Sequence, residues 1–550
     1  MLKALRLFAR LLLLVVVLFI LAAALLQVPS VQTRATKILT DYLSEQTGFQ
    51  TEIQKVHIRW WDAVSLGNVR IYDLEDSLMA DLEAVHIDFS IGGLLDKERP
   101  GLDEIRLNRG LVRILIHPNS SAPNVSTFLA RINTLTRPSR PKGEGPVPFH
   151  IGNISLDETS VDIINYKLEA FDTGFDYGKL RFRDLVADAD DFYVKRDTVG
   201  FSLNFLRGTE STSGFVFQQL RTDFTYSNSG MEFKNLLLRS NETEIKDYLK
   251  FTYEDVSALN DFNRRVDILA HLDEAALDIA DLKLFFQVIP EIDDKLFVSG
   301  EIKGRINEFQ SEQLLVRFGE RSALFGKFNI EGLPDIENTF FNLSLMNSTL
   351  TSKDLSPYIG PEAQRELDKF KEIRFNTDFT GYLKSFSTKG AFRSSIGRIS
   401  GNLNYQSRNL PATFSGKVQL NGLDLGVILE DKDTFQKTSL KGRVKGSGTS
   451  LKTALLELEA EVENIGIYGY DYKGITTNAT FGKDLFEGLL TVDDPNLKMK
   501  LNGSLDLRNN KDSIRMEANL DTAFLRELNL MEEESFLSGN FEMDTKGVSL

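Results

Sequence analysis

The chain has 550 residues, a formal net charge of −15 and no cysteine. This length exceeds one ordinary hydrophobic core and predicts either several domains or one elongated array of repeats. The lack of cysteine excludes disulfides, thiolate nucleophiles and cysteine-bound metal ions. The negative charge, without a basic stripe, disfavours a nucleic-acid partner.

The N-terminus combines a basic flank with an apolar run. Residues 1–10 contain Lys3, Arg6 and Arg10, and every residue from 11 to 26 is apolar. We therefore predict a cytoplasmic flank over 1–10 and a retained transmembrane anchor over 11–30, with the rest of the chain exported. The alternative is a signal peptide cleaved near the alanines at 22–24, although the apolar run continues beyond them.

Residues 31–117 form the first predicted module after the anchor. Apolar residues recur at helical spacing and Gly48 suits a C-terminal cap, which predicts an amphipathic helix over 33–46. Alternating apolar and polar residues then predict strands at 51–61, 63–73, 79–90 and 102–117. The pair Trp60–Trp61 fits either an interfacial belt near a membrane or packing of one ring inward.

Residues 118–148 differ from the strands on either side. The region from His117 to His150 holds six of the fourteen prolines and predicts an exposed linker. Within it, "NVSTFLARINTL" predicts one short helix capped by Asn124 or Ser126.

Residues 149–550 read as a repetitive β body. A short helical or turn segment recurs around Leu282, Leu355 and Leu425, with a poorer copy around Leu525, and a glycine-punctuated strand follows each. The irregular intervals predict a stacked array of repeats. The chain stops within a predicted strand and without a capping unit, so we expect a fragment of a longer protein.

The alternating strands leave one apolar face for which few long helices are available as cover. The residues that we expect to line this face lie in mid-strand on the apolar parity: Leu203, Phe205, Leu343, Leu345, Leu403 and Tyr405. A bulge could invert the parity locally. The residues alone fit two arrangements, an open apolar surface or two sheets packed face to face.

The sequence lacks the usual signatures of catalysis or metal binding. The five histidines are scattered, and His57 and His86 fall on the polar parity of strands. The segment with Asp188, Asp190 and Asp191 lacks the glycine and the closing glutamate of a calcium loop, which leaves an acidic turn. We therefore predict no catalytic, cofactor or metal site, and a protein that is not an enzyme.

Two stretches resemble the AsmA-like family, to which the TamB proteins belong. The first runs from the anchor through the helix and strands to "GGLLD" (92–96) and "IRLNRGLVRI" (105–114). The second, "KFNIEGLPDIENTFFNLSLMNSTLTSKDLSPYI" (327–359), is similar to the body repeats of TamB-like proteins. Each motif alone is degenerate, so their order along the chain carries the resemblance.

The resemblance implies a mainly β fold, with a transmembrane helix followed by a long, curled, antiparallel-type sheet called a β-taco. It implies a single-pass protein of the cell inner membrane, with its bulk in the periplasm and an apolar groove for phospholipid acyl chains. The partner implied is an outer-membrane barrel protein of the TamA or BamA type. The family's C-terminal domain, which engages that partner, is absent from this sequence. The function implied is lipid transport in outer-membrane biogenesis; the alternative is assembly of outer-membrane barrel proteins or autotransporters.

Overall fold

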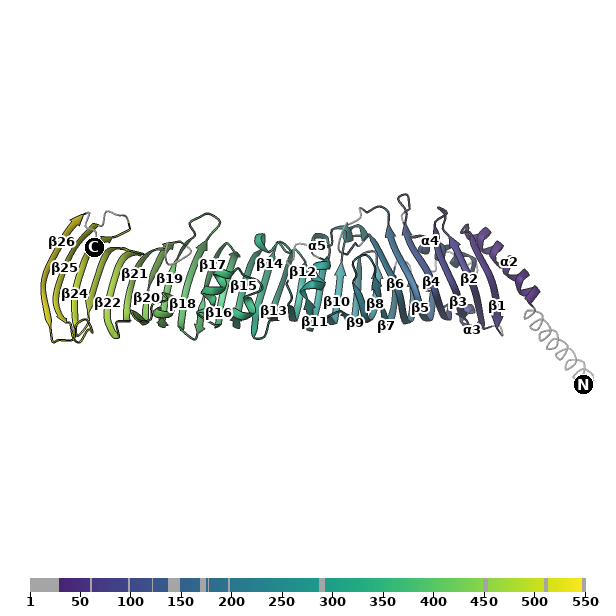
Figure 1. Ribbon diagram of the computed structural model, residues 1–550. Coiled ribbons are helices and arrows are strands. Elements are labelled where there is room, and N and C mark those ends of the chain that lie inside the picture. Colours follow the sequence, from purple (N-terminus) through teal and green to yellow (C-terminus); the bar gives the residue numbers. More distant parts are fainter. Residues whose placement is uncertain are drawn as a thin grey trace, which may run out of the picture. The chain divides into compact units, whose positions relative to one another are not determined.

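A computed structural model describes residues 29–59, 62–96, 99–120, 122–136, 149–168, 175–176, 178–195, 198–285, 292–448, 454–508 and 513–546 (Figure 1). The basic flank, the anchor as far as Val28 and the Trp60–Trp61 pair lie outside these residues. Among the helices that are described, none has the length and apolar character needed to cross a membrane.

The described chain is mainly β and forms one sheet of 26 strands with a few short helices, as predicted. Two compact units divide it: residues 1–291 with 303–305, and residues 292–302 with 306–550. Strand β12 (Lys295–Arg305) is shared between them. Each unit is considered by itself below.

Among the described residues, the first unit contains eleven strands and six helical segments. Its strands are β1 (Thr51–Arg59), β2 (Ala63–Tyr72), β3 (Leu78–Asp88), β4 (Gly101–Ile116), β5 (Phe149–Asn165), β6 (Lys179–Lys195), β7 (Thr198–Glu210), β8 (Val216–Ser227), β9 (Gly230–Ser240), β10 (Thr243–Thr252) and β11 (Asp267–Asp278). Its helices are α2 (Pro29–Thr47), α3 (Ile91–Leu95), α4 (Asn124–Thr136), η1 (Val256–Asp261), α5 (Phe262–Arg265) and α6 (Ile279–Phe285).

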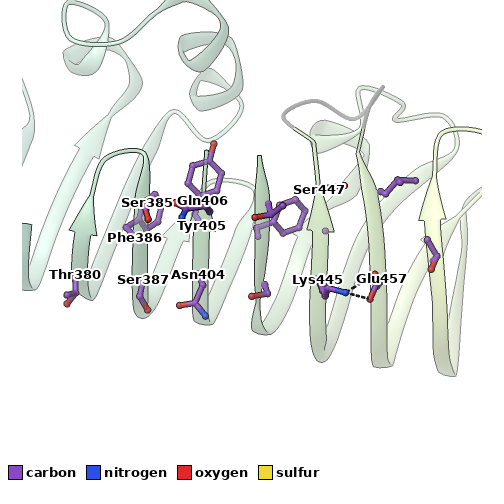
Figure 2. A pocket seen from close by; sticks show the side chains of 16 residues that line it. Thr380, Ser385, Phe386, Ser387, Asn404, Tyr405, Gln406, Lys445, Ser447 and Glu457 are labelled. Carbon is purple, nitrogen blue, oxygen red and sulfur yellow. Dashed lines mark hydrogen bonds and ion pairs between the residues drawn. The ribbon is translucent and has the colours of Figure 1, made fainter. Parts of the chain in front are cut away.

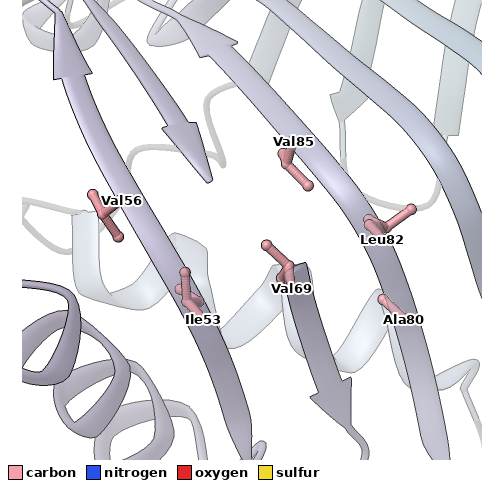
Figure 3. Close-up of a cluster of buried hydrophobic side chains, with 6 residues drawn as sticks. All are labelled: Ile53, Val56, Val69, Ala80, Leu82 and Val85. Atoms are coloured by element: carbon pink, nitrogen blue, oxygen red, sulfur yellow. The ribbon is translucent and has the colours of Figure 1, made fainter. Parts of the chain in front are cut away.

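The helix predicted after the anchor is present as α2, and it ends where the sequence predicts. Gly48 adopts a φ of +72°, a conformation that suits glycine, and its N–H bonds to the Ser44 carbonyl oxygen at 2.9 Å. Leu43 of α2 packs against six buried side chains on β1, β2 and β3, which Figure 3 shows: Ile53, Val56, Val69, Ala80, Leu82 and Val85. The apolar face of these first strands is therefore a covered core.

Within the segment predicted as an exposed linker, residues 118–120 and 122–136 are described, and the helix that they contain is docked. Strands β4 and β5 pair in parallel from Gly101 opposite His150 to Ile116 opposite Asn165, so the sheet continues across this segment. The predicted helix exists as α4, but its Phe128 ring packs edge-on against the fully buried Phe49, with centroids 5.1 Å apart. A parallel pair requires a crossover connection. Residues 137–148 lie outside the described chain.

The second unit contains the remaining strands, and from β13 to β26 each strand pairs antiparallel with the next. The first seven are β13 (Glu308–Phe318), β14 (Ser322–Glu331), β15 (Phe340–Thr351), β16 (Glu372–Tyr382), β17 (Ser385–Ser394), β18 (Gly397–Gln406) and β19 (Thr413–Asp424). The last seven are β20 (Phe435–Ser447), β21 (Leu455–Ile467), β22 (Tyr470–Gly482), β23 (Leu485–Asp493), β24 (Leu497–Asp506), β25 (Ser513–Phe524) and β26 (Phe536–Lys546).

The recurring segments predicted from the sequence are short helical insertions between strands. They are α6 after β11, then α7 (Ser352–Leu355) with α8 (Pro361–Asp368) after β15, and α9 (Leu425–Ile428) after β19. The poorer copy forms turns after β25 and buries Leu528. Within the second unit these strands run in the same direction, so their insertions lie along one side of the sheet. Another short helix, η2 (Ile336–Asn338), precedes β15.

Candidate functional site

The apolar face of the second unit is built from side chains that oppose one another across strands. Leu343 lies opposite Phe379, Phe379 opposite Thr388, and Thr388 opposite Leu403. Two of the predicted lining residues therefore belong to one row that crosses β15 to β18. This is the arrangement that unbroken alternation along each strand produces in register.

A second row brings Tyr405 among aromatic rings. Tyr405 lies opposite Phe386 on one side and Phe414 on the other. The ring centroids of Phe386 and Tyr405 are 5.2 Å apart, and those of Phe379 and Phe386 are 4.8 Å apart. Ring centroids at these distances make favourable contacts. Because Tyr405 is not fully buried, its hydroxyl does not need a partner within the protein.

Leu345 shares this face but is almost fully buried, with 6% of its surface exposed. It lies opposite Gly326 and Thr377. Gly326 has a φ of +152°, and a Cβ atom there would lie 3.0 Å from the Leu345 Cα and collide with the Ser344 carbonyl oxygen. The glycine thus allows the two backbones to approach closely here. Because Leu345 is almost fully buried, it is a packing position.

Among the described residues, the apolar face over β16 to β19 is only partly buried. Phe375 and Leu423 are buried, whereas most side chains of the apolar parity keep some exposure, including Phe379, Phe392, Leu403 and Phe414. In a face-to-face sandwich these mid-strand positions would be buried. The structure therefore favours the open surface over the sandwich in this part of the sheet.

The opposite face is polar and solvated. Three ion pairs cross from β20 to β21, with N–O distances of 2.7 Å for Lys441–Glu461, 3.4 Å for Arg443–Glu459 and 3.1 Å for Lys445–Glu457. All six side chains are more than half exposed, so each pair contributes little to stability. Because these side chains are exposed, they show which parity of β20 and β21 faces water.

A shallow depression of about 780 Å³ lies at the strand ends between β16 and β22 (Figure 2). Ser387, Asn404, Ser415 and the Lys445–Glu457 pair line it from the polar parity, and the rings of Phe386, Tyr405 and Phe414 border it. Twisted sheets curve in opposite senses along their two directions, so a polar face can be hollow locally. Residues of both parities line this depression, so it belongs to the strand ends and not to the polar face alone.

In the first unit, Leu203 belongs to an apolar face with a run of phenylalanines. Phe201 lies opposite Phe224 and Phe224 opposite Phe233, with ring centroids 5.1 Å and 4.9 Å apart. Leu203 follows on the same parity and is 7% exposed.

Phe205 does not continue this alternation. The register between β6 and β7 shifts, so that Leu203 lies opposite Ala189 but Phe205 lies opposite Asp188. The bulge leaves Phe205 beside the polar parity, where the Asn204 amide donates to Asp188 at 2.8 Å. Parity counting from the sequence thus misplaces this one lining candidate.

The acidic segment around residue 188 is part of strand β6 rather than a turn. The Asn153 amide bridges Asp188 and Asp190 at 2.9 Å each, and Asn204 bridges the same two residues. These bonds, from Asn153 and then Asn204, lower the pKa of Asp190. Among the described residues no group of three acidic, histidine or cysteine side chains is arranged to hold a metal ion.

His86 and His117 each lie within hydrogen-bond distance of a side-chain oxygen. His86 lies 2.6 Å from the Ser65 hydroxyl on the polar face. His117 is largely buried and lies 2.7 Å from Asp73, which also accepts from the Asn124 amide at 3.1 Å. This second network ties α4 to the turn between β2 and β3, a structural role that the sequence did not reveal.

Buried carboxylates hold the strand ends of both units. Asp354 accepts the backbone N–H groups of Glu320, Arg321 and Ser322 at 3.0, 2.9 and 2.8 Å. Burial acts to raise the pKa of Asp354, but these hydrogen bonds outweigh it and hold the pKa well below its usual range. Asp354, which directly precedes Leu355 of the recurring segment, therefore fixes the turn between β13 and β14.

Comparison with known proteins adds no assignment: no family model, no curated protein and no solved structure matches this chain.

Proposed function

We propose that this protein is a periplasmic bridge, anchored in the inner membrane, that carries phospholipid toward the outer membrane along the apolar face of its sheet. The observation that supports this most is the row through Leu343, Phe379 and Leu403, which is apolar but partly exposed. Soluble proteins rarely leave contiguous apolar surface of this kind uncovered.

Acyl chains are the ligand that suits such a surface. The face offers hydrocarbon and aromatic rings and, at Leu343, Leu403 and Tyr405, no charged group of the same parity. Each buried methylene contributes about 0.8 kcal/mol without directional bonding. A chain held only by such contacts can slide from one strand to the next, which transport along a sheet requires.

We further propose that the sheet curls along its length, so that the apolar face lines a groove of the β-taco kind. The resemblance to the AsmA-like family and the ion pairs on the opposite face support this orientation. The basic residues ahead of the apolar run at 11–26 support a cytoplasmic N-terminus and a periplasmic bulk.

Photo-crosslinking tests the proposal directly. A photoreactive residue placed at Leu403 in the full-length chain, within the intact cell envelope, should yield adducts of phospholipid mass. The matched control is the neighbouring position Asn404, which faces the polar side and should give none. Crosslinks from Leu403 to unfolded outer-membrane proteins, without lipid, would instead favour the assembly-factor function.

A further inference from the structure

Three arginines oppose one another across neighbouring strands on the polar face of the second unit. Arg374 of β16 lies opposite Arg393 of β17, and Arg393 lies opposite Arg398 of β18. All three are exposed. Directly opposed residues of an antiparallel pair have Cβ atoms about 5 Å apart, so the register gathers three guanidinium groups on one small patch. We call these three residues the arginine row.

The arginine row differs from the charge pattern between β20 and β21. There Lys441, Arg443 and Lys445 each form an ion pair with a glutamate. Like charges directly opposite one another are destabilising in a sheet. A chain with a net charge of −15 has many carboxylates available, yet the row opposes cation to cation twice.

A single carboxylate partly neutralises the patch. Glu372 binds Arg374 at 2.8 Å with one oxygen and Arg321 at 2.9 Å with the other. Within the part of the chain that the structure describes, Arg393 and Arg398 have no ion-pair partner. Glu372 therefore binds two guanidinium groups, and the two at the far end of the row, Arg393 and Arg398, are available to bind an anion.

We propose that the arginine row binds a phosphoryl group. The planar guanidinium fork matches phosphate oxygens in a bidentate fashion, and adjacent forks can share one group. The phosphoryl group can come from a soluble phosphate ester or from the headgroup of an anionic lipid at a membrane surface. The row lies on the face opposite the apolar rows, so this site is independent of the proposed transport function.

The test compares two double variants of the full-length protein with equal changes in charge. Arg393→Gln/Arg398→Gln removes the free arginines, whereas Lys441→Gln/Arg443→Gln removes two cations from the paired ladder on the same face. Binding is measured by calorimetric titration with pyrophosphate. It is measured separately by flotation with vesicles of phosphatidylglycerol or of phosphatidylcholine.

We expect the first double variant to lose at least tenfold in affinity, and the ladder variant to stay within twofold of the parent protein. Loss in the pyrophosphate titration identifies a soluble phosphate ester as a source. Loss confined to phosphatidylglycerol vesicles identifies the lipid headgroup. Arg393→Lys/Arg398→Lys should bind more weakly than the parent, because lysine keeps the charge but not the fork.

Thermal unfolding distinguishes a loss of anion binding from a loss of folded structure. Replacing Arg393 and Arg398 relieves repulsion, so the variant should unfold at the parent's temperature or above it. Pyrophosphate should raise the unfolding midpoint of the parent and of the ladder variant, but not that of Arg393→Gln/Arg398→Gln. An equal loss of affinity in both double variants would mean that anions are attracted only by the summed electrostatic potential of this face, and it would overturn the proposal. Absence of binding to pyrophosphate and to both kinds of vesicle in the parent would overturn it as well.

Discussion

At the scale of single residues, carboxylates set the turns that the strands need. Asp354 is 6% exposed and accepts three backbone N–H groups from the turn between β13 and β14. Glu210 does the same for the turn after β7, where it is fully buried and accepts from Ser213 and Thr212. A carboxylate can satisfy several donors at once, which makes it hard to replace.

We expect Asp354→Asn to lower the free energy of unfolding by about 1–3 kcal/mol, because an amide offers one acceptor oxygen for three buried donors. The pKa of Asp354 is depressed in the folded state, so its contribution is present above the unfolded-state value near 4 and is lost as pH falls toward the folded-state value.

Denaturant unfolding at pH 7 and pH 3 measures both effects, and the gap between variant and parent should narrow at the lower pH. Asp378→Asn is the matched control, since Asp378 is exposed and its carboxylate accepts one hydrogen bond among the described residues, from the Ser344 hydroxyl. Equal unfolding of the Asp354 variant and its parent at pH 7 would contradict this role.

Also at this scale, alternation predicted which face most of the candidate residues share, and the exception has a local cause. Leu343, Leu403 and Tyr405 share the face that their parity predicts. Phe205 does not, because an extra residue in β7 shifts the register, and no residue type in that strand signals the shift. The burial of Leu345 was not predictable, because alternation gives the parity of a side chain but not how deeply it is buried.

At the scale of elements, strands and short helices were predictable, whereas their docking was not. The helix over 124–136 follows from spacing and capping, but proline content suggested a loose linker around it. Its contacts with Phe49 and Asp73 join residues far apart in the sequence. The parallel pairing of β4 with β5 was equally hidden, because alternation is the same for either strand direction.

The docking of α4 depends on Asn124, so we expect Asn124→Ala to release this helix. Its side chain accepts from the Leu115 N–H at 2.9 Å and donates to Asp73 at 3.1 Å, both in buried surroundings. Loss of these bonds should cost about 1–3 kcal/mol. Hydrogen exchange should show faster exchange over residues 115–136. Ser126→Ala, at an exposed position of the same helix, should leave exchange unchanged; similar rates in both variants would argue against the docked arrangement.

At the scale of the whole molecule, the sequence predicted a polar and an apolar face but not whether the apolar face is covered. A sandwich and an open surface produce the same alternation along each strand. The two arrangements can be distinguished only by how exposed the apolar side chains of paired strands are, as in β16 to β19. The arginine row was hidden for a related reason, since Arg374 and Arg393 become neighbours only through pairing.

The most direct test of the account is the amount of lipid carried by a Leu403→Asp variant. Leu403 is partly exposed and lies opposite Thr388 and Gly416, so a carboxylate there can reach water when no lipid is present. With acyl chains against it, the same unpaired charge would be costly. Asn404→Asp is the matched control on the polar face, opposite Ser387 and Ser415. Ser344 would be a poorer control, because it donates to Asp378 at 2.7 Å and a second carboxylate there would repel the first.

Native mass spectrometry of the purified full-length proteins counts the phospholipid bound to each molecule, and thermal unfolding is recorded alongside. The account predicts that Leu403→Asp loses most of its lipid and unfolds within a few degrees of the parent, while Asn404→Asp matches the parent in both. If Leu403→Asp kept the parent's lipid, or if it lost lipid only together with its folded structure, acyl chains would not lie on this open face and the account would be wrong.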